Sequence, residues 1–486
     1  MSTTNATGIG SSGDHALYAP GRKIYAKKID GQFRRIKWGI QLFTLAVYYL
    51  LPFVRWNRGL NEPSQAVLAD FEHSRFYFFF IEIWPQEVYY VTGLLILAAL
   101  MLFLMNAVAG RIWCGYMCPQ TMWTDLYLMT ERWIEGDSRE RARKDAGSWT
   151  PQHIREKLSK HVVWLLIAWW TGGAWVLYFA DAPTLVWKLA TFAPGAGEAY
   201  VWIGIFTFMT YILAGHMREQ VCLYMCPWPR IQAALTDEYA LNVTYRFDRG
   251  EPRESLKHAV ALRAQGAPAG DCIDCGQCVA VCPTGVDIRQ GASLGCIQCG
   301  LCIDACDAVM SKVGRPSRLI AYDTEMNIER RQCGKASIYR PIRVRTVTYA
   351  VLILAIGGFM SFTLATRSDV RLSLLHDRNP LTVKLKDGSV RNAYTARLSN
   401  MTAETRRFTL DVSGLKGAEV EVVGAEPDAQ GHIMIETGPD QTREARVLVT
   451  VRGHRGAASQ FPVIFTARAI DGRSAGATVK DVFVWQ

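Results

Sequence analysis

Two runs of four cysteines with identical spacing lie between residues 272 and 306 of this chain. Each run follows the pattern Cys-x2-Cys-x2-Cys-x3-Cys, and a proline follows the first. The runs consist of Cys272, Cys275, Cys278 and Cys282, and of Cys296, Cys299, Cys302 and Cys306. Three thiolates on a short loop can bind three irons of one cube, and a more distant fourth thiolate completes the set. This region is therefore expected to fold around metal.

The spacing is typical of a bacterial ferredoxin-like domain with two [4Fe–4S] clusters, in which the fourth cysteine of each run binds the other cluster. It predicts one cluster on Cys272, Cys275, Cys278 and Cys306, and a second on Cys296, Cys299, Cys302 and Cys282. A structural zinc module is the alternative, because CxxC pairs also bind zinc. Zinc needs only four ligands, and each run here has more cysteine pairs than that site requires. The spacing therefore favours clusters that pass single electrons.

Composition indicates a membrane protein of several units. The chain has 486 residues, 50% of them hydrophobic, and 15 tryptophans, which is too long for one core and rich in residues of membrane interfaces. A net charge of +10 fits membrane lipid or nucleic acid equally well. The distribution of this charge along the chain, described next, decides for lipid, and no nucleic-acid partner is expected. The first 19 residues are small and polar, which predicts a disordered segment without a signal peptide.

Five apolar runs approach the ~20 residues needed to cross a bilayer. They cover residues 38–54, 88–109, 161–180, 200–215 and 346–366. The first 37 residues carry seven Lys and Arg and residues 110–160 carry nine, whereas residues 56–87 carry two and residues 181–199 one. The positive-inside rule then places the N-terminus and the cysteine runs in the cytoplasm and the chain after residue 367 outside. All thirteen cysteines precede that point, which suits a reducing cytoplasm.

The tail changes to a strand pattern. Short segments with β-branched residues, separated by turn signals, are expected to be strands. They cover residues 381–385, 392–398, 407–412, 419–423, 433–436, 445–451, 462–469 and 478–485. Such spacing predicts an antiparallel immunoglobulin-like β-sandwich. We therefore expect an N-terminal segment (1–37), a four-span membrane domain (38–240), a ferredoxin-like domain (241–345), a fifth transmembrane helix (346–366) and the sandwich (367–486).

A second pair of cysteine motifs lies where the second and fourth runs end. The sequences are WCGYMCP at residues 113–119 and VCLYMCP at residues 221–227. Proline suits the first position of a helix, which makes Cys118 and Cys226 the predicted N-cap residues, with thiol pKa values lowered by the helix. Thiolates and thioethers are soft ligands that select Cu(I). The candidate copper ligands are Cys114, Cys118, Cys222 and Cys226, with Met117 and Met225.

Three other interpretations of these motifs exist. Disulfides are disfavoured on the reducing side of the membrane, and small buried cysteines do not explain the repetition of C-x3-C-P. A third iron–sulfur cluster on the four thiolates stays open. His161 and His216 flank apolar runs near the same face and are weaker candidates, because a lone histidine there is more often an interfacial polar residue. Cys333 belongs to no motif.

Taken together, these features resemble one known family. The five apolar runs, WCGYMCPQT, CLYMCPWPRIQ, the doubled cysteine run, AYDTEMNIERR before the last apolar run and the sandwich are similar to the CcoG/FixG/RdxA family of cytochrome c oxidase accessory proteins. The resemblance covers nearly the whole chain beyond residue 21. It implies a cupric reductase that supports assembly of cbb3-type cytochrome oxidase in the bacterial inner membrane, with roles for the eight run cysteines and the four motif cysteines.

The expected activity is electron transfer from a cytoplasmic donor through two [4Fe–4S] clusters to Cu(II), with Cu(I) passing to copper-handling assembly factors and the oxidase. A quinol-linked electron-transfer subunit of a respiratory reductase is one alternative. A copper chaperone or assembly scaffold with structural clusters is another.

Overall fold

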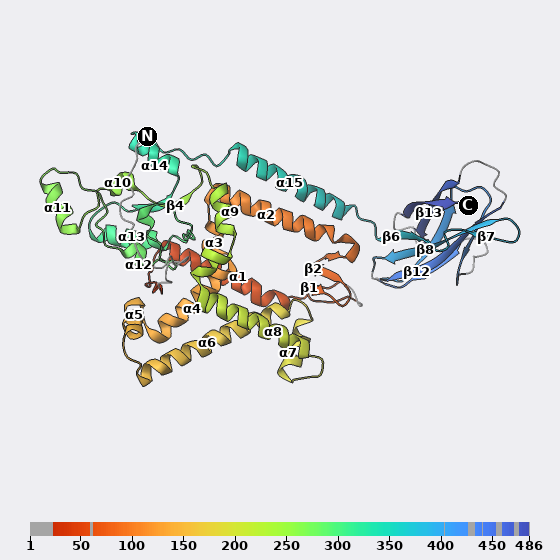
Figure 1. Ribbon diagram of the computed structural model, residues 1–486, viewed down its shortest axis with the longest axis horizontal. Helices are drawn as coiled ribbons and strands as arrows, with labels where there is room; N and C mark the ends of the chain where they lie inside the picture. Colours follow the sequence, from red (N-terminus) through yellow and green to blue (C-terminus); the bar gives the residue numbers. More distant parts are fainter. Residues whose placement is uncertain are drawn as a thin grey trace, which may run out of the picture. The chain divides into compact units, whose positions relative to one another are not determined.

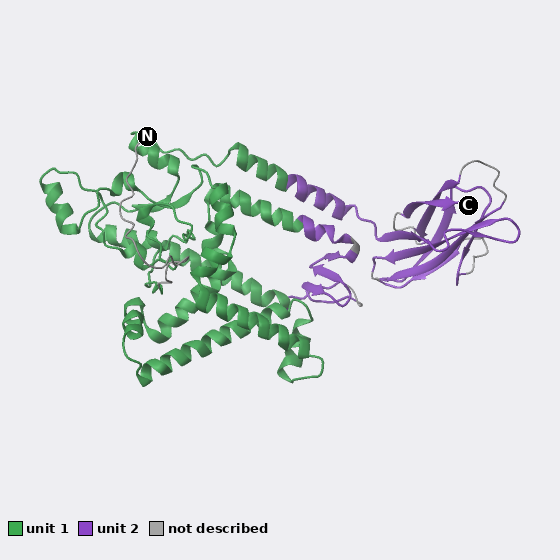
Figure 2. Ribbon diagram, viewed as in Figure 1, with its two compact units in different colours: residues 1–52, 94–353 green, residues 53–93, 354–486 purple. Residues whose placement is uncertain are grey.

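The computed structural model describes residues 23–58, 62–402, 404–425, 433–439, 441–452, 459–470 and 476–485. The predicted disorder of residues 1–19 lies outside these ranges. The chain forms two compact units, which Figure 2 colours separately. The first comprises residues 1–52 and 94–353, and the second residues 53–93 and 354–486. Helices α2 (Tyr89–Ala109) and α15 (Val344–Ala365) each contribute residues to both.

Within the part of the chain that the structure describes, four helices are long and apolar enough to cross a membrane (Figure 1). They are α1 (Gln32–Leu50) with its continuation η1 (Leu51–Phe53), α2 (Tyr89–Ala109), α8 (Gly197–Thr210) with the π-helical segment η3 (Tyr211–Met217), and α15 (Val344–Ala365). They correspond to the first, second, fourth and fifth predicted spans. Few residues of their apolar stretches are buried within the protein, as expected of helices that face lipid.

The third predicted span lies in α6 (Pro151–Val176), which is not among those four. The first ten residues of α6 are mostly polar and include Arg155, Lys157 and Lys160, so its apolar part is shorter than a full span. That part still exposes large side chains, including Trp169 and Trp170. The five-span arrangement therefore stays a prediction.

Helix α1 begins six residues before the predicted span because its first turns pack inside the protein. The carboxylate of Asp304 accepts hydrogen bonds from the backbone N–H groups of Phe33 (3.1 Å) and Arg34 (2.8 Å). The guanidinium of Arg34 binds both oxygens of buried Asp125 at 2.9 Å, and Lys37 lies 3.8 Å from the same carboxylate. These basic residues thus anchor the helix by charge pairing.

The cysteine-rich region is small and irregular. Its elements are β4 (Asn242–Tyr245), α10 (Phe247–Gly250), α11 (Leu256–Ala264), α12 (Gln277–Ala280), η5 (Ile288–Gln290), α13 (Leu301–Lys312), β5 (Ile320–Asp323) and α14 (Glu325–Gln332). Strands β4 and β5 pair antiparallel. The core contains Ile303, Met310, Leu319 and Ile320 together with several cysteines, so the cysteine loops are part of the core itself.

The remaining helices of the first unit connect the long ones. They are α3 (Ile112–Tyr116), α4 (Pro119–Glu135), α5 (Ser138–Ala146), α7 (Ala182–Ala190), the π-helical segment η4 (Val221–Met225) and α9 (Trp228–Leu235). The WCGYMCP motif spans α3 and the start of α4, and VCLYMCP spans η4 and the approach to α9.

The second unit contains two β structures. A three-stranded antiparallel sheet, β1 (Val67–Asp70), β2 (Arg75–Phe78) and β3 (Ile81–Ile83), precedes the short helix η2 (Pro85–Glu87). The C-terminal tail forms the predicted sandwich of two sheets. Tyr394, Phe408, Phe465 and Phe483 are fully buried, so packing holds this domain.

All eight predicted strand segments are found. They are β7 (Val383–Lys384), β8 (Val390–Asn400), β9 (Arg406–Ser413), β10 (Ala418–Val422), β11 (Ile433–Thr437), β12 (Thr442–Val451), β13 (Gln460–Ala469) and β14 (Ala477–Val484). A further strand, β6 (Val370–His376), lies at the edge of one sheet and was not predicted. Strand β6 begins soon after α15 ends, so its alternation of apolar and polar residues is hard to distinguish from the end of the apolar run. That sheet has the order β10-β12-β8-β6, with β7 pairing with β8, and the second sheet has the order β11-β9-β13-β14.

Candidate iron–sulfur and thiol sites

The two cysteine runs fold into matching loops. Asp274 and Gly276 in the first loop, and Gln298 and Gly300 in the second, have positive φ. The two glycines are the N-cap residues of α12 and α13. Glycine reaches this left-handed conformation without the Cβ penalty of other residues. Two such turns in each run of nearly identical sequence bend both loops in the same way.

Each loop surrounds a cavity. Cys272, Cys275 and Cys278 of the first run line one cavity, and Cys306 of the second run is the fourth cysteine in its wall. Cys296, Cys299 and Cys302 of the second run line the other, together with Cys282 of the first. The fourth cysteine of each run thus lines the cavity of the other run, as a pair of four-thiolate clusters requires.

The two cavities share a wall, because Cys278 lines both. Helix α13 also connects them, with Cys302 facing one and Cys306, four residues later, facing the other. Burial raises the pKa of the Cys278 thiol to about 11 and that of Cys306 to about 12. Thiols in such surroundings become thiolates when metal replaces the proton.

All thirteen cysteines are free. Across the described ranges, no group of three or more His, Cys, Asp or Glu residues is arranged to hold a metal ion. The four thiolates of a cubane cluster surround several iron and sulfide atoms, so they lie farther apart than the ligands of a single metal ion. The two cysteine-lined cavities therefore still suit clusters. For the four motif cysteines it means that a single copper ion would need the thiols to move closer together.

The first motif is a short helix packed on the second cysteine run. A Cβ on Gly115 would lie 2.7 Å from the carbonyl oxygen of Ile297 and 3.0 Å from the Cα of Cys299, so only glycine fits this contact without displacement. The buried hydroxyl of Tyr116 donates a hydrogen bond to the carbonyl of Cys299 at 3.0 Å. The thiol of Cys114 donates to Oε1 of Gln232 at 3.6 Å.

Arg111 joins both motifs to the same run. Its guanidinium donates to the carbonyl of Leu294 at 2.7 Å and to that of Pro229, just after the second motif, at 2.9 Å. Its backbone N–H donates to Oε1 of Gln298 at 2.7 Å. Burial lowers the pKa of this guanidinium, and the carbonyls around it supply its hydrogen bonds.

The two motifs bring their four cysteines into one electrostatic neighbourhood. The pKa of the Cys114 thiol is raised to about 12, mainly by burial. The negative charge that Cys118, Cys222 and Cys226 would carry as thiolates acts in the same direction with smaller effect. Burial also raises the pKa of Cys222 to about 11. The thiols of Cys114 and Cys222 therefore carry protons at neutral pH unless a metal displaces them.

Two details of the second pair of motifs differ from the sequence prediction. Cys118 is the N-cap of α4, but Pro227, one residue after Cys226, is the N-cap of α9. Burial raises the pKa of Cys118, although the N–H groups of Thr121 and Gln120 act in the opposite direction. The lowering expected for Cys118 is wrong because loss of water outweighs the helix terminus.

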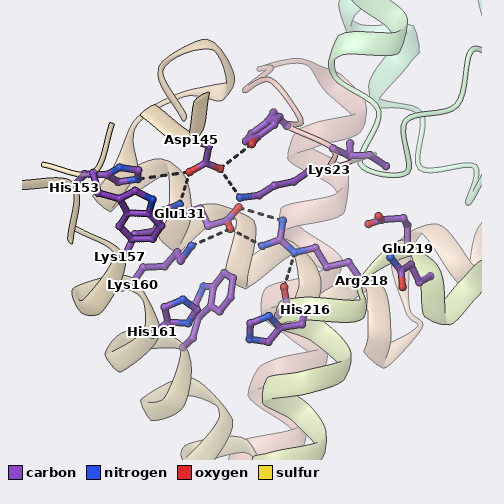
Figure 3. A pocket seen from close by; sticks show the side chains of 16 residues that line it. Lys23, Glu131, Asp145, His153, Lys157, Lys160, His161, His216, Arg218 and Glu219 are labelled. Carbon is purple, nitrogen blue, oxygen red and sulfur yellow. Dashed lines mark hydrogen bonds and ion pairs between the residues drawn. The ribbon is translucent and has the colours of Figure 1, made fainter. Parts of the chain in front are cut away.

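The other candidate residues lie differently. Met117 and Met225 are 39% and 55% exposed, unlike the partly buried thiols, and Cys333 is exposed at the end of α14. His161 and His216 lie together, with ring centroids 5.8 Å apart and planes 11° from parallel. Both line a polar cavity of about 620 Å³ (Figure 3). This cavity was not predicted from the sequence. The sequence feature that pointed to it was the position of His161 and His216 at the ends of apolar runs.

Known proteins match this chain in the same parts. Residues 217–325 match the family described as "4Fe-4S dicluster domain", residues 91–135 match "4Fe-4S binding domain", and residues 360–486 match "IG-like fold at C-terminal of FixG". Together with the two cysteine-lined cavities and the four apolar helices, these matches define a membrane protein with a dicluster iron–sulfur domain and an electron-transfer role.

Relatives match over most of the chain. It is 46% identical to the nitrogen fixation protein FixG of Rhizobium meliloti, over 90% of this chain and 87% of that protein. It is 48% identical to protein RdxB of Cereibacter sphaeroides, over 82% of this chain and 83% of that protein. It is 49% identical to protein RdxA of the same organism, over 84% of this chain and 86% of that protein. The chain belongs to the FixG/RdxA family, which confirms the resemblance seen in the sequence.

Proposed function

We propose that this protein is a membrane-bound cupric reductase that converts Cu(II) to Cu(I). The observation that carries the proposal is the packing of the first C-x3-C-P motif on the second cysteine run. Gly115 and Tyr116 contact the backbone of Cys299 directly. A redox site beside Cys114 would therefore lie next to the wall of the second cluster cavity.

Each set of thiols has its own role in this proposal. Cys272, Cys275, Cys278 and Cys306 hold one [4Fe–4S] cluster, and Cys282, Cys296, Cys299 and Cys302 hold the other. When bound, these clusters supply single electrons. Cys114, Cys118, Cys222 and Cys226 bind the copper substrate, and thiolate ligands favour its reduced form. Met117 and Met225 stay predicted additional ligands.

The reduction itself needs no acid or base. One electron reaches one Cu²⁺ and gives one Cu⁺, and the bound thiols lose their protons to water when copper binds. The partial burial of Cys114 and Cys222 limits contact between Cu⁺ and solvent. The chain's own residues thus bind copper, exclude water and hold the motif against the second cysteine run.

A third iron–sulfur cluster on the four motif cysteines is the second candidate. The match of residues 91–135 to "4Fe-4S binding domain" favours it, because that range includes Cys114 and Cys118. Iron analysis separates the two: two clusters of four irons give eight iron atoms per chain, and a third would add four more. A copper chaperone or scaffold would bind copper without oxidising the clusters.

The cellular setting follows from the resemblance and from charge. We place the protein in the bacterial inner membrane with five spans, α6 included, the clusters in the cytoplasm and the sandwich in the periplasm. Its partners would be an electron donor that acts on the cytoplasmic side, copper-handling assembly factors and a cbb3-type oxidase. A periplasm-dependent reporter should be active when fused after Ser368 and inactive after Ser311, and the reverse result would overturn this orientation.

The direct test uses purified protein without oxygen. Protein reduced with dithionite and freed of excess reductant should lose its reduced-cluster signal on addition of Cu(II), with one trapped Cu(I) for each electron lost. A Cys333→Ser variant serves as the control. Copper binding without cluster oxidation would indicate a scaffold and contradict the proposal.

A further inference from the structure

The cavity of about 620 Å³ in the first unit is a second candidate site (Figure 3). Helices α4, α5 and α6, the end of η3 and the segment from Lys23 contribute to its wall. Figure 3 shows His161 and His216 side by side, with the Arg218 and Glu131 side chains meeting beside them. None of these residues belongs to the cysteine motifs.

An irregular backbone builds one wall of this cavity. His216 lies in the π-helical segment Tyr211–Met217, and Arg218 directly after it has a φ of 42°. Gly215 has no Cβ, and one built there would lie 3.1 Å from the ring of Trp164. π-helical turns and left-handed non-glycine residues cost free energy and occur often at functional sites.

The lining cations are already paired. Glu131, 2% exposed, forms ion pairs with Arg218 and Lys160. Lys23 pairs with Asp145, and Lys157 pairs with both Asp145 and Glu135. Every lysine and arginine in the wall thus has a carboxylate partner, so the cavity does not favour a highly charged ligand such as a nucleotide.

The uncharged part of the wall suits a flat aromatic molecule. The parallel rings of His161 and His216 stand edge-on to the buried ring of Trp164, at 83° and 89°. Nδ1 of His161 shares a hydrogen bond of 2.9 Å with the hydroxyl of Tyr211. In the tautomer that donates through Nδ1, Nε2 of His161 keeps a lone pair that can accept a proton.

The cavity lies between an apolar helix and the cysteine sites. His216 is one residue from the end of the candidate span Gly197–Met217. Arg218 and Glu219 line this cavity and also a smaller one shared with Cys222 and Thr284. Thr284 in turn lines the second cluster cavity, with its hydroxyl 3.4 Å from the sulfur of Cys282. Continuous packing thus connects the cavity to both metal sites.

We propose that this cavity binds a lipid-soluble hydroquinone as the electron donor of the protein, an inference that rests on the proposed electron-transfer function. Oxidation breaks two O–H bonds and yields one quinone, two protons and two electrons. The protons go to the ring nitrogens of His161 and His216 and then to water. The electrons leave one at a time toward the two cysteine-lined cavities, whose clusters would pass them on, so that one hydroquinone would reduce two Cu²⁺ to two Cu⁺.

A hydroquinone fits this electron count without a further cofactor. It can give up its electrons singly, whereas a reduced nicotinamide transfers a hydride, and a flavin would be needed to divide it into single electrons.

The test uses the whole protein in lipid nanodiscs under anaerobic conditions, with duroquinol as the probe and cluster reduction followed by electron paramagnetic resonance. Duroquinol should reduce the clusters of the unaltered protein. His161→Gln and His216→Gln should slow that reduction roughly a hundredfold, because glutamine cannot take up the proton. His258→Gln, on exposed α11, is the matched control and should keep the original rate.

Iron content and the signals produced by dithionite report whether each variant has folded. Duroquinol that leaves the clusters of the unaltered protein oxidised, or equal rates in all three variants, would overturn the inference. If dithionite-reduced protein still reduces Cu(II), this inference alone has failed. If duroquinol reduces the clusters and Cu(II) is not reduced, the hydroquinone site stands and the cupric reductase proposal fails.

Discussion

The two C-x-Y-M-C-P motifs have nearly the same sequence and different surroundings. The first is an α-helical turn whose Gly115 touches the backbone of the second cysteine run and whose Tyr116 is 5% exposed. The second is a π-helical turn with Leu223 at the glycine position and a Tyr224 that is 55% exposed. Cys222 of the second motif lines a cavity that also includes Arg218 and Glu219.

This difference suggests a division of labour. The first motif is held against the second cluster cavity, where electrons would arrive. The second lies on irregular backbone, where a site can rearrange at smaller cost than inside a packed α-helix. A copper ion that needs the four thiols to move closer would therefore draw mainly on the second motif for that movement.

Exchanging the residues that distinguish the motifs should have the largest effect. Gly115→Leu would force the first motif away from Ile297 and Cys299, and a displacement of ~1 Å can slow a positioned reaction by about a hundredfold. Leu223→Gly, the reciprocal change, should cause a much smaller loss. The rate at which Cu(II) re-oxidises dithionite-reduced clusters measures both. Equal rates in the two variants would remove the distinction between the motifs.

Removing the link between the motifs should have an intermediate effect. Arg111→Met keeps the apolar stem of the side chain and loses the hydrogen bonds to Leu294 and Pro229, each worth about 1.5–3 kcal/mol for a charged donor. The clusters should be lost at a lower temperature, as followed by their visible absorbance. Arg230→Met, on the exposed face of α9, is the control. Unchanged thermal loss in Arg111→Met would show that this link is dispensable.

The smallest effect is expected from one hydroxyl. Tyr116→Phe removes the hydrogen bond to the Cys299 carbonyl and should cost about 0.5–1.5 kcal/mol, again seen as earlier loss of cluster absorbance on heating. Tyr224→Phe should cost less, because that side chain is more than half exposed. A larger loss of thermal stability in Tyr224→Phe than in Tyr116→Phe would show that the second motif, and not the first, is the better packed one.

The ferredoxin loops and the sandwich could be predicted because their signals are local. Cysteine spacing and alternation along a strand depend on neighbours in sequence, and the fourth-cysteine exchange between runs follows from the spacing alone. The start of helix α1 could not be predicted in this way, since Arg34 and Lys37 extend the helix beyond its apolar run by pairing with Asp125. Only the fold brings that carboxylate to them.

The thiol pKa values and the polar cavity could not be read from the sequence. Burial of Cys118 depends on what covers it, and sequence shows only that a helix begins there. Glu131, Asp145, His161 and His216 come from α4, α5, α6 and η3, so no spacing rule connects them. A π-helical turn such as Tyr211–Met217 also has no sequence signature that we recognise.

The central claim is that electrons pass from the clusters to copper at the four motif thiols. The most direct measurement is Cu(I) trapping and iron analysis on dithionite-reduced Cys118→Ser and Cys226→Ser, beside Cys333→Ser. The account predicts eight irons per chain in all three, from two clusters of four, and Cu(I) formation only in Cys333→Ser. Full Cu(I) formation in either motif variant, or loss of iron from it, would contradict the account.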